Sequence, residues 1–96
     1  MAKYSLKSYA PSLSEKADAE KIRQQISALD PQNNIVEIDF EDIVAMTTIC
    51  ARLIFGQLYL DLGPELYNKN IKIIHCEETL EIIIRWGIES ALEHEV

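Results

Sequence analysis

The chain has 96 residues, of which 48% are hydrophobic and 26% are charged, a composition typical of a globular domain and unlike that of disordered chains. We expect one domain over residues 1–96 that folds unaided. Nine Lys and Arg against sixteen Asp and Glu give a net charge of −7 without any basic cluster, which argues against nucleic acid and anionic membranes as partners.

The location in the cell and the state of the cysteines are also predicted from composition. No stretch approaches the roughly 18 apolar residues that span a bilayer, and residues 1–5 lead into polar chain rather than into a signal-peptide core. We therefore expect a cytoplasmic protein. Cys50 and Cys76 lie among apolar neighbours without the C-x-x-C spacing of redox and zinc centres, so both are predicted to be reduced core residues.

The first half of the chain predicts two strands with a helix between them. Residues 4–9 alternate weakly between apolar and polar side chains, as in a short edge strand. Ser12 and Glu15 have the spacing of a capping box before a helix. That helix has one narrow apolar stripe, Ala19, Ile22, Ile26 and Leu29, and ends at residues 30–34. Residues 35–40 are rich in β-branched side chains and predict the central strand.

The second half predicts a helix, a strand and a further helix. Thr47 or Thr48 is expected to cap the second helix, which ends at Leu62 before the helix-terminating pair at residues 63–64. A turn over residues 67–70 then leads into a strand over residues 71–75, and a third helix runs from Glu77 or Glu78 to about residue 92. This β-α-β-α-β-α order predicts an α/β fold with helices packed on a small, mostly parallel sheet.

Both helices of the second half have apolar residues on two sides at about 100° per residue. On the second helix the core-facing set is Ala51, Ile54, Phe55, Leu58 and Leu62, and an outer stripe on the opposite side consists of Ile49, Leu53, Gly56 and Leu60. On the third helix the core-facing set is Leu80, Ile83, Ile84, Gly87, Ile88 and Ala91, with Ile82 and Trp86 on the far side.

Surplus apolar surface of this kind has three readings. The helices bury it against each other, or against the first helix and the N-terminal segment. Alternatively, a protein partner covers it, or two copies of the chain close a symmetric homodimer through it. If a partner binds, Trp86 is the natural anchor, because tryptophan is enriched among the residues that dominate binding energy.

Catalytic signatures are absent from the sequence. It contains no P-loop, G-x-G-x-x-G, G-x-S-x-G or H-E-x-x-H motif, so no catalytic residue is predicted. His, Cys and Glu follow one another at residues 75–78, but adjacent residues of an extended segment point in opposite directions, which argues against a metal site. No metal or other cofactor is expected.

Two acids, Asp39 and Asp42, flank the end of the central strand, where open α/β sheets present functional groups. Without an evident His, Lys or Ser partner, we expect a turn acid and a solvated loop acid. A small enzyme or nucleotide-binding domain that uses these acids with the Thr47–Thr48 turn is the alternative.

The segment from Asp39 to Leu58, D-F-E-D-I-V-A-M-T-T-I-C-A-R-L-I-F-G-Q-L, resembles the signature of the bacterial STAS-like domain family, which is close to D-F-S-G-V-x-x-I-S-S-S-F-A-D-E-L-F-G-x-L. The D-F pair, the hydrophobic-Thr-Thr turn and F-G-x-L recur at the right spacing. The resemblance extends more loosely over the helix before the central strand, the strand at residues 70–75 and the final helix. It implies a single STAS-like domain that regulates a partner without catalysing a reaction.

STAS domains, which are similar in fold to this family, include the anti-sigma-factor antagonists, which bind a serine kinase of the histidine-kinase-like ATPase class and are switched off by phosphorylation. The matching phosphoacceptor here is Thr48, preceded by Thr47 where those antagonists carry Asp. The chain also departs from the pattern at residues 41–42, where Glu-Asp replaces Ser-Gly, and at Ile49, which replaces Ser. Thr48 is therefore a candidate phosphoacceptor, with a helix cap as its alternative role.

The leading interpretation of the sequence is a non-enzymatic STAS-like regulatory or adaptor domain that presents the second helix, with Thr47 and Thr48 at its start, to a protein partner. The residues expected to contact the partner are Ile49, Leu53, Gly56, Leu60, Ile82 and Trp86. A homodimerising module is the second interpretation.

Overall fold

The strands form a sheet of three parallel strands, β1 (Ala2–Ser5), β3 (Val36–Asp39) and β5 (Ile71–Ile74), in the order β1-β3-β5. The computed structural model describes residues 2–94. Strand β3 pairs Val36 with Ala2 on one side and with Ile71 on the other. The predicted central strand is thereby confirmed, and so is the parallel arrangement.

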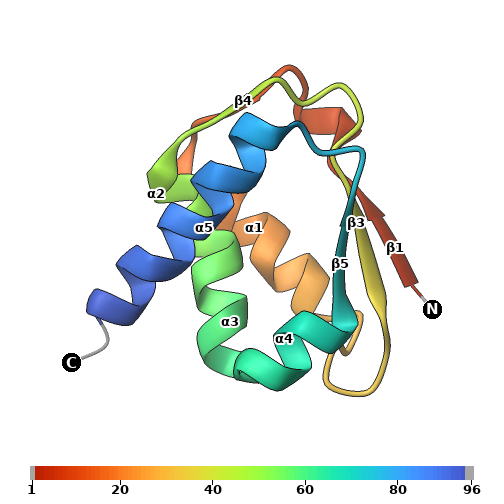
Figure 1. The fold of residues 1–96 in the computed structure, drawn as a ribbon. Helices are drawn as coiled ribbons and strands as arrows, with labels where there is room; N and C mark the ends of the chain where they lie inside the picture. Colours follow the sequence, from red (N-terminus) through yellow and green to blue (C-terminus); the bar gives the residue numbers. More distant parts are fainter. Residues whose placement is uncertain (1, 95–96) are drawn as a thin grey trace.

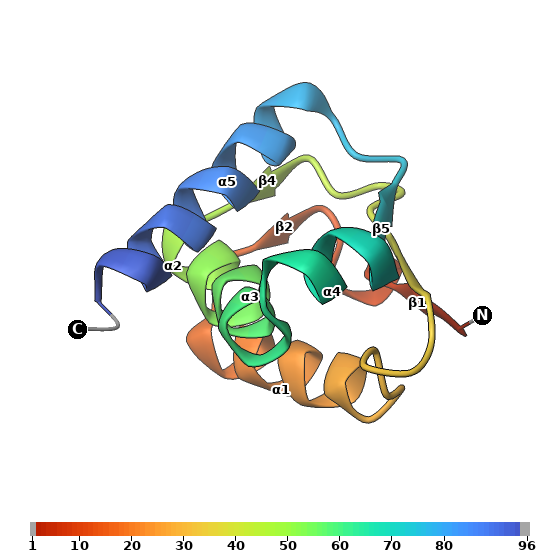
Figure 2. The ribbon, with the colours of Figure 1, turned by 60° about the horizontal axis from the view of Figure 1, so that its bottom comes forward.

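The helices lie to one side of this sheet (Figures 1 and 2). They are α1 (Lys16–Ser27), α2 (Thr48–Ala51), α3 (Gln57–Leu62), α4 (Pro64–Asn70) and α5 (Glu78–Glu93). The π-helical turn η2 (Arg52–Gly56) joins α2 to α3, and we call the continuous helix that these three form the long helix. Alternate residues of the central strand, Val36 and Ile38, are fully buried, while Glu37 between them is only partly buried. This is the alternation expected of a strand with one face against a core.

The hydrophobic core lies between the sheet and the helices. Phe40, just after β3, stacks on Phe55 of η2 with ring centroids 5.8 Å apart, and both side chains are fully buried. The core-facing positions predicted on the helices are buried or partly buried, including Ala19, Ile22 and Ile26 of α1 and Leu80, Ile84, Gly87 and Ala91 of α5. No helix within residues 2–94 is long and apolar enough to cross a membrane.

The N-terminal segment differs from the prediction in two places. The edge strand occupies Ala2–Ser5 rather than residues 4–9, because Lys7–Tyr9 form a 3-10 turn closed by a bond from the Tyr9 amide to the Leu6 carbonyl. The predicted capping box is wrong as well. Ser12 belongs to the two-residue strand β2 (Ser12–Leu13), which pairs in parallel with β4 (Ala45–Met46), and Glu15 is the residue that precedes α1.

The second half contains an additional helix. Gly63 ends α3 with a φ of 84°, a conformation that favours glycine, and Pro64 then occupies the first position of α4. The predicted turn over residues 67–70 is therefore wrong, because these residues complete α4 and run directly into β5. The helix that follows β5 begins at Glu78 and ends at Glu93, as predicted within one residue.

Candidate functional site

The start of α2 is fixed in place by the short β2–β4 pair. The Thr47 amide donates to the Leu13 carbonyl at 3.0 Å, and the Thr47 hydroxyl oxygen accepts from the Cys50 amide at 3.2 Å. Thr47 is thus the N-cap, as predicted for one of the two threonines. Thr48 is the first helical residue, and both side chains are exposed. The structure places the candidate phosphoacceptor on the surface at the N-terminus of a long helix.

The long helix and α5 cross at two glycines. A β-carbon on Gly87 would lie 2.6 Å from the backbone of Ala51 and Arg52, and one on Gly56 would lie 2.7 Å from the Ala91 β-carbon. Such distances leave no room for a side chain at either position. The two helices therefore pack backbone against backbone, and their relative position is closely defined.

The π-helical turn explains why Gly56 is buried here instead of lying on the outer stripe. A π-helical turn closes i→i+5 hydrogen bonds in place of i→i+4, so residues five apart come onto one side of the helix. Ala51 and Gly56 are five apart, and both contact α5 at Gly87. The regular spacing used for the prediction placed them on different faces, and the structure corrects this for Gly56.

The other predicted contact residues remain at least partly accessible. Trp86 is 54% exposed, Ile49 46% and Ile82 36%. Leu53 and Leu60 are partly buried, and Leu53 packs against the core. Trp86 precedes Gly87, so it lies about a quarter turn around α5 from the contact with α2. Exposed apolar side chains thus occur on both of the helices that cross at the glycines.

The strand-end acids have different surroundings. The Asp39 side chain is only 7% exposed. Its carboxylate accepts one hydrogen bond from the Glu41 amide and lies 2.9 Å from Nδ1 of His75. The Lys3 ammonium is 3.7 Å away. These contacts, the amide bond first and the His75 bond second, lower the pKa of Asp39 despite its burial. The ionised Asp39 side chain at the end of β3 therefore interacts with Lys3 of β1 and with His75 at the end of β5.

Asp42 lies outside this cluster. It is exposed, has a φ of 70°, and pairs with Lys7 at 3.7 Å. His75, which the sequence analysis did not connect with Asp39, also has a positive φ of 54° at the end of β5. Asp39 and His75 are 36 positions apart, and only the parallel pairing of β3 with β5 reveals that their side chains meet.

Among residues 2–94, no group of three or more His, Cys, Asp and Glu side chains is arranged to hold a metal ion.

The two cysteines are free, and they differ in burial. Cys50 is fully buried, as predicted, with its sulfur 3.6 Å from the Glu15 carbonyl oxygen. Cys76 is only partly buried, because it follows β5 in the loop before α5. Burial first, and then the nearby acids Glu81 and Glu77, raise the pKa of its thiol to about 11. A thiol in this environment is a poor nucleophile at neutral pH.

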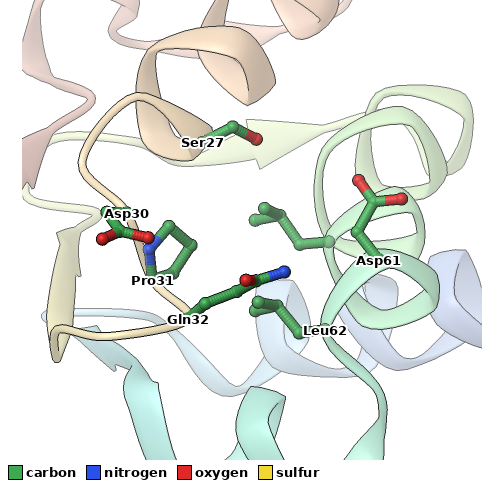
Figure 3. A pocket seen from close by; sticks show the side chains of 7 residues that line it. Ser27, Asp30, Pro31, Gln32, Asp61 and Leu62 are labelled. Carbon is green, nitrogen blue, oxygen red and sulfur yellow. The ribbon is translucent and has the colours of Figure 1, made fainter.

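Three shallow cavities follow one another along the outer side of the long helix. The first has a volume of about 300 Å³ and lies between the C-terminal end of α1 and α3. Figure 3 shows Asp30 and Asp61 on opposite sides of it, with Gln32 extending between them. The second shares Asp61 with the first, and Leu53 and Gln57 line both the second and the third.

The fold and this surface define a small α/β domain with an accessible helix start and exposed apolar residues on neighbouring helices. The family model described as a STAS-like domain of unknown function matches residues 18–81, about two thirds of the chain. The chain therefore belongs to the STAS-like domain family. The match includes the start of α2 and Asp39, whereas Ile82 and Trp86 lie beyond it. No curated protein and no solved structure matches the chain.

Proposed function

We propose that this STAS-like domain is a non-enzymatic regulatory module that binds a protein partner, in the manner of an anti-sigma-factor antagonist. The observation that carries the proposal is the exposure of Trp86, Ile49 and Ile82 on two helices whose relative position is defined by backbone contact. Ile82 and Trp86 are neighbours one turn apart on α5, and neighbouring exposed apolar side chains with a large aromatic among them are typical of interaction sites.

The start of α2 supports a switch in the same module. A phosphate on Thr48 would add up to about two negative charges beside the free amide groups and the positive dipole end of the long helix. The surface around it belongs to a protein of net charge −7, so an added phosphate would change the charge presented to a partner. A kinase of the histidine-kinase-like ATPase class is the corresponding partner.

Partner binding is tested by affinity capture from a lysate of the source cells, followed by identification of the retained proteins by mass spectrometry. We expect a protein that wild type retains and Trp86→Ala loses. Ile35→Ser is the matched control, because Ile35 is also an exposed apolar residue but precedes β3 at the far end of the sheet. Equal retention by Trp86→Ala, checked with the purified partner, would contradict the proposal.

Phosphorylation is tested separately by intact-mass measurement after incubation with the cognate kinase and ATP. We expect the addition of one phosphate to wild type and no addition to Thr48→Val, which keeps the shape of the side chain but removes its hydroxyl. Thr47→Val is the control for the neighbouring hydroxyl. An unmodified wild type, or a modified Thr48→Val, would exclude Thr48 as the phosphoacceptor.

A further inference from the structure

The exposed face of α5 carries acidic residues around its apolar pair. Glu78, Ile82, Trp86, Glu89 and Glu93 follow at steps of four, four, three and four, which places them on one side of the helix, and all five are exposed. We call these five residues the acidic face. Arg85 lies beside Ile82 at its edge and is the one basic residue between Glu78 and Glu93.

We propose that the acidic face binds a basic amphipathic helix of the partner protein, with apolar residues against Ile82 and Trp86 and lysines or arginines opposite Glu78, Glu89 and Glu93. The inference rests on the proposed function and names the chemistry of the partner. Complementary charge is what distinguishes this occupant from others, since carboxylates that flank an apolar centre favour cations at the rim of the contact.

Trp86 strengthens the preference for a basic partner. Tryptophan is the aromatic side chain that attracts a guanidinium or ammonium group most strongly over its ring face. Glu89 lies one turn beyond Trp86 on the same side of the helix. A partner cation placed over the indole therefore also has a carboxylate within reach, and the two attractions act on the same group.

A second copy of the chain suits the acidic face poorly. In an antiparallel two-fold pair of α5 helices that stacks Ile82 of one copy on Trp86 of the other, Glu78 of one copy falls beside Glu89 of the other. Such a pairing brings like charges together twice, once on each side of the axis. Both copies also carry a net charge of −7, which adds repulsion.

The test measures binding of synthetic peptides, of the same length as α5, to the full chain. Binding is followed by the fluorescence anisotropy of a dye on the peptide as protein is added, and one peptide should bind per chain at saturation. The probe is a helix of leucines on one side and lysines on the other. One control peptide has the same composition in scrambled order, and another has glutamate in place of every lysine. We expect saturable binding of the probe at physiological salt, at least about tenfold tighter than binding of either control.

Charge-matched variants of the protein separate a local effect from a global one. Glu89→Lys combined with Glu93→Lys should weaken binding of the probe by about fivefold or more, since two exposed ion pairs become repulsive. Glu20→Lys combined with Glu41→Lys changes the net charge equally at exposed positions on α1 and after β3, outside α5, and should weaken it by less than about twofold because distant charges are screened. Trp86→Ala should weaken it by at least about tenfold.

Several results would overturn the inference. If the two charge variants weaken binding equally, only the net charge of the protein attracts the peptide. If the scrambled peptide binds as tightly as the probe, the protein does not recognise the apolar side of a helix. A wild-type dimer in sedimentation that Trp86→Ala dissociates means that a second copy covers the face. If capture of the cellular partner needs Trp86 but tolerates Glu89→Lys with Glu93→Lys, the proposed function stands and the basic partner is wrong.

Discussion

Replacement of Gly87 by alanine tests the close crossing of α5 and the long helix. In an open helix this change stabilises by about 1 kcal/mol, because alanine has the higher helix propensity. Here the new β-carbon would lie 2.6 Å from the Ala51 carbonyl carbon and the Arg52 nitrogen, and 2.7 Å from the Ala51 β-carbon. Carbon atoms in contact sit about 3.5–4.0 Å apart, so α5 must move away by about 1 Å.

The expected net effect is destabilisation by about 1–3 kcal/mol. Backbone atoms cannot rotate out of the way, so the overlap is relieved only by separation of the helices, and overpacking of this kind typically outweighs the gain in propensity. Urea unfolding followed by far-ultraviolet circular dichroism measures the change. Glu89→Ala on the exposed side of α5 is the control and should lie within about 0.5 kcal/mol of wild type. A Gly87→Ala protein as stable as wild type would refute the backbone contact.

Three other changes have definite expected results. Thr47→Ala should lower the free energy of unfolding by about 1 kcal/mol, because it removes the helix cap. Thr48→Ala should change it by less than about 0.5 kcal/mol, and urea unfolding measures the free energy of both variants. Folding lowers the pKa of Asp39 from 3.8, so its carboxylate stabilises the native state above that pH, and this contribution is lost as the pH falls below it. In thermal unfolding measured from pH 6 to about pH 2, the melting temperature should therefore fall less steeply for Asp39→Asn than for wild type. Cys76, with its pKa raised to about 11, should react with a thiol-specific dye much more slowly in the native protein at pH 7.5 than in urea, and fast labelling of the native form would contradict its burial.

Regular periodicity was sufficient to predict the main elements. The central strand, the helix from Thr48 to Leu62 and the helix from Glu78 to Glu93 each combine a strong apolar pattern with local start or stop residues. The Thr47 cap was predictable for the same reason, because the residue type and its position at the start of an apolar helix act locally.

The differences arise where distant parts of the chain decide the local structure. Ser12 has the spacing of a cap, but its backbone pairs with Ala45, which is 33 positions further along. The π-helical turn leaves no mark in composition, so the burial of Gly56 was not foreseen. The contact between Asp39 and His75 likewise depends on which strands become neighbours, and a single sequence does not specify this.

The five-residue π-helical turn is the place where the long helix accommodates a change of one residue in length. Removal of one residue between Arg52 and Gly56 would restore the ordinary winding without breaking the helix, because the segment has one residue more than a regular turn accommodates. Residues five apart across this turn, such as Ala51 and Gly56, would then be four apart in a regular helix and would still lie on one side, so both ends of the long helix would keep their faces toward α5. Thr48 and Ile49 would therefore keep their direction in such a shortened chain. Removal of one residue from the regular part of the helix over Gln57–Leu62 would instead rotate the two flanks by about 100°, and that change is the one the core would oppose.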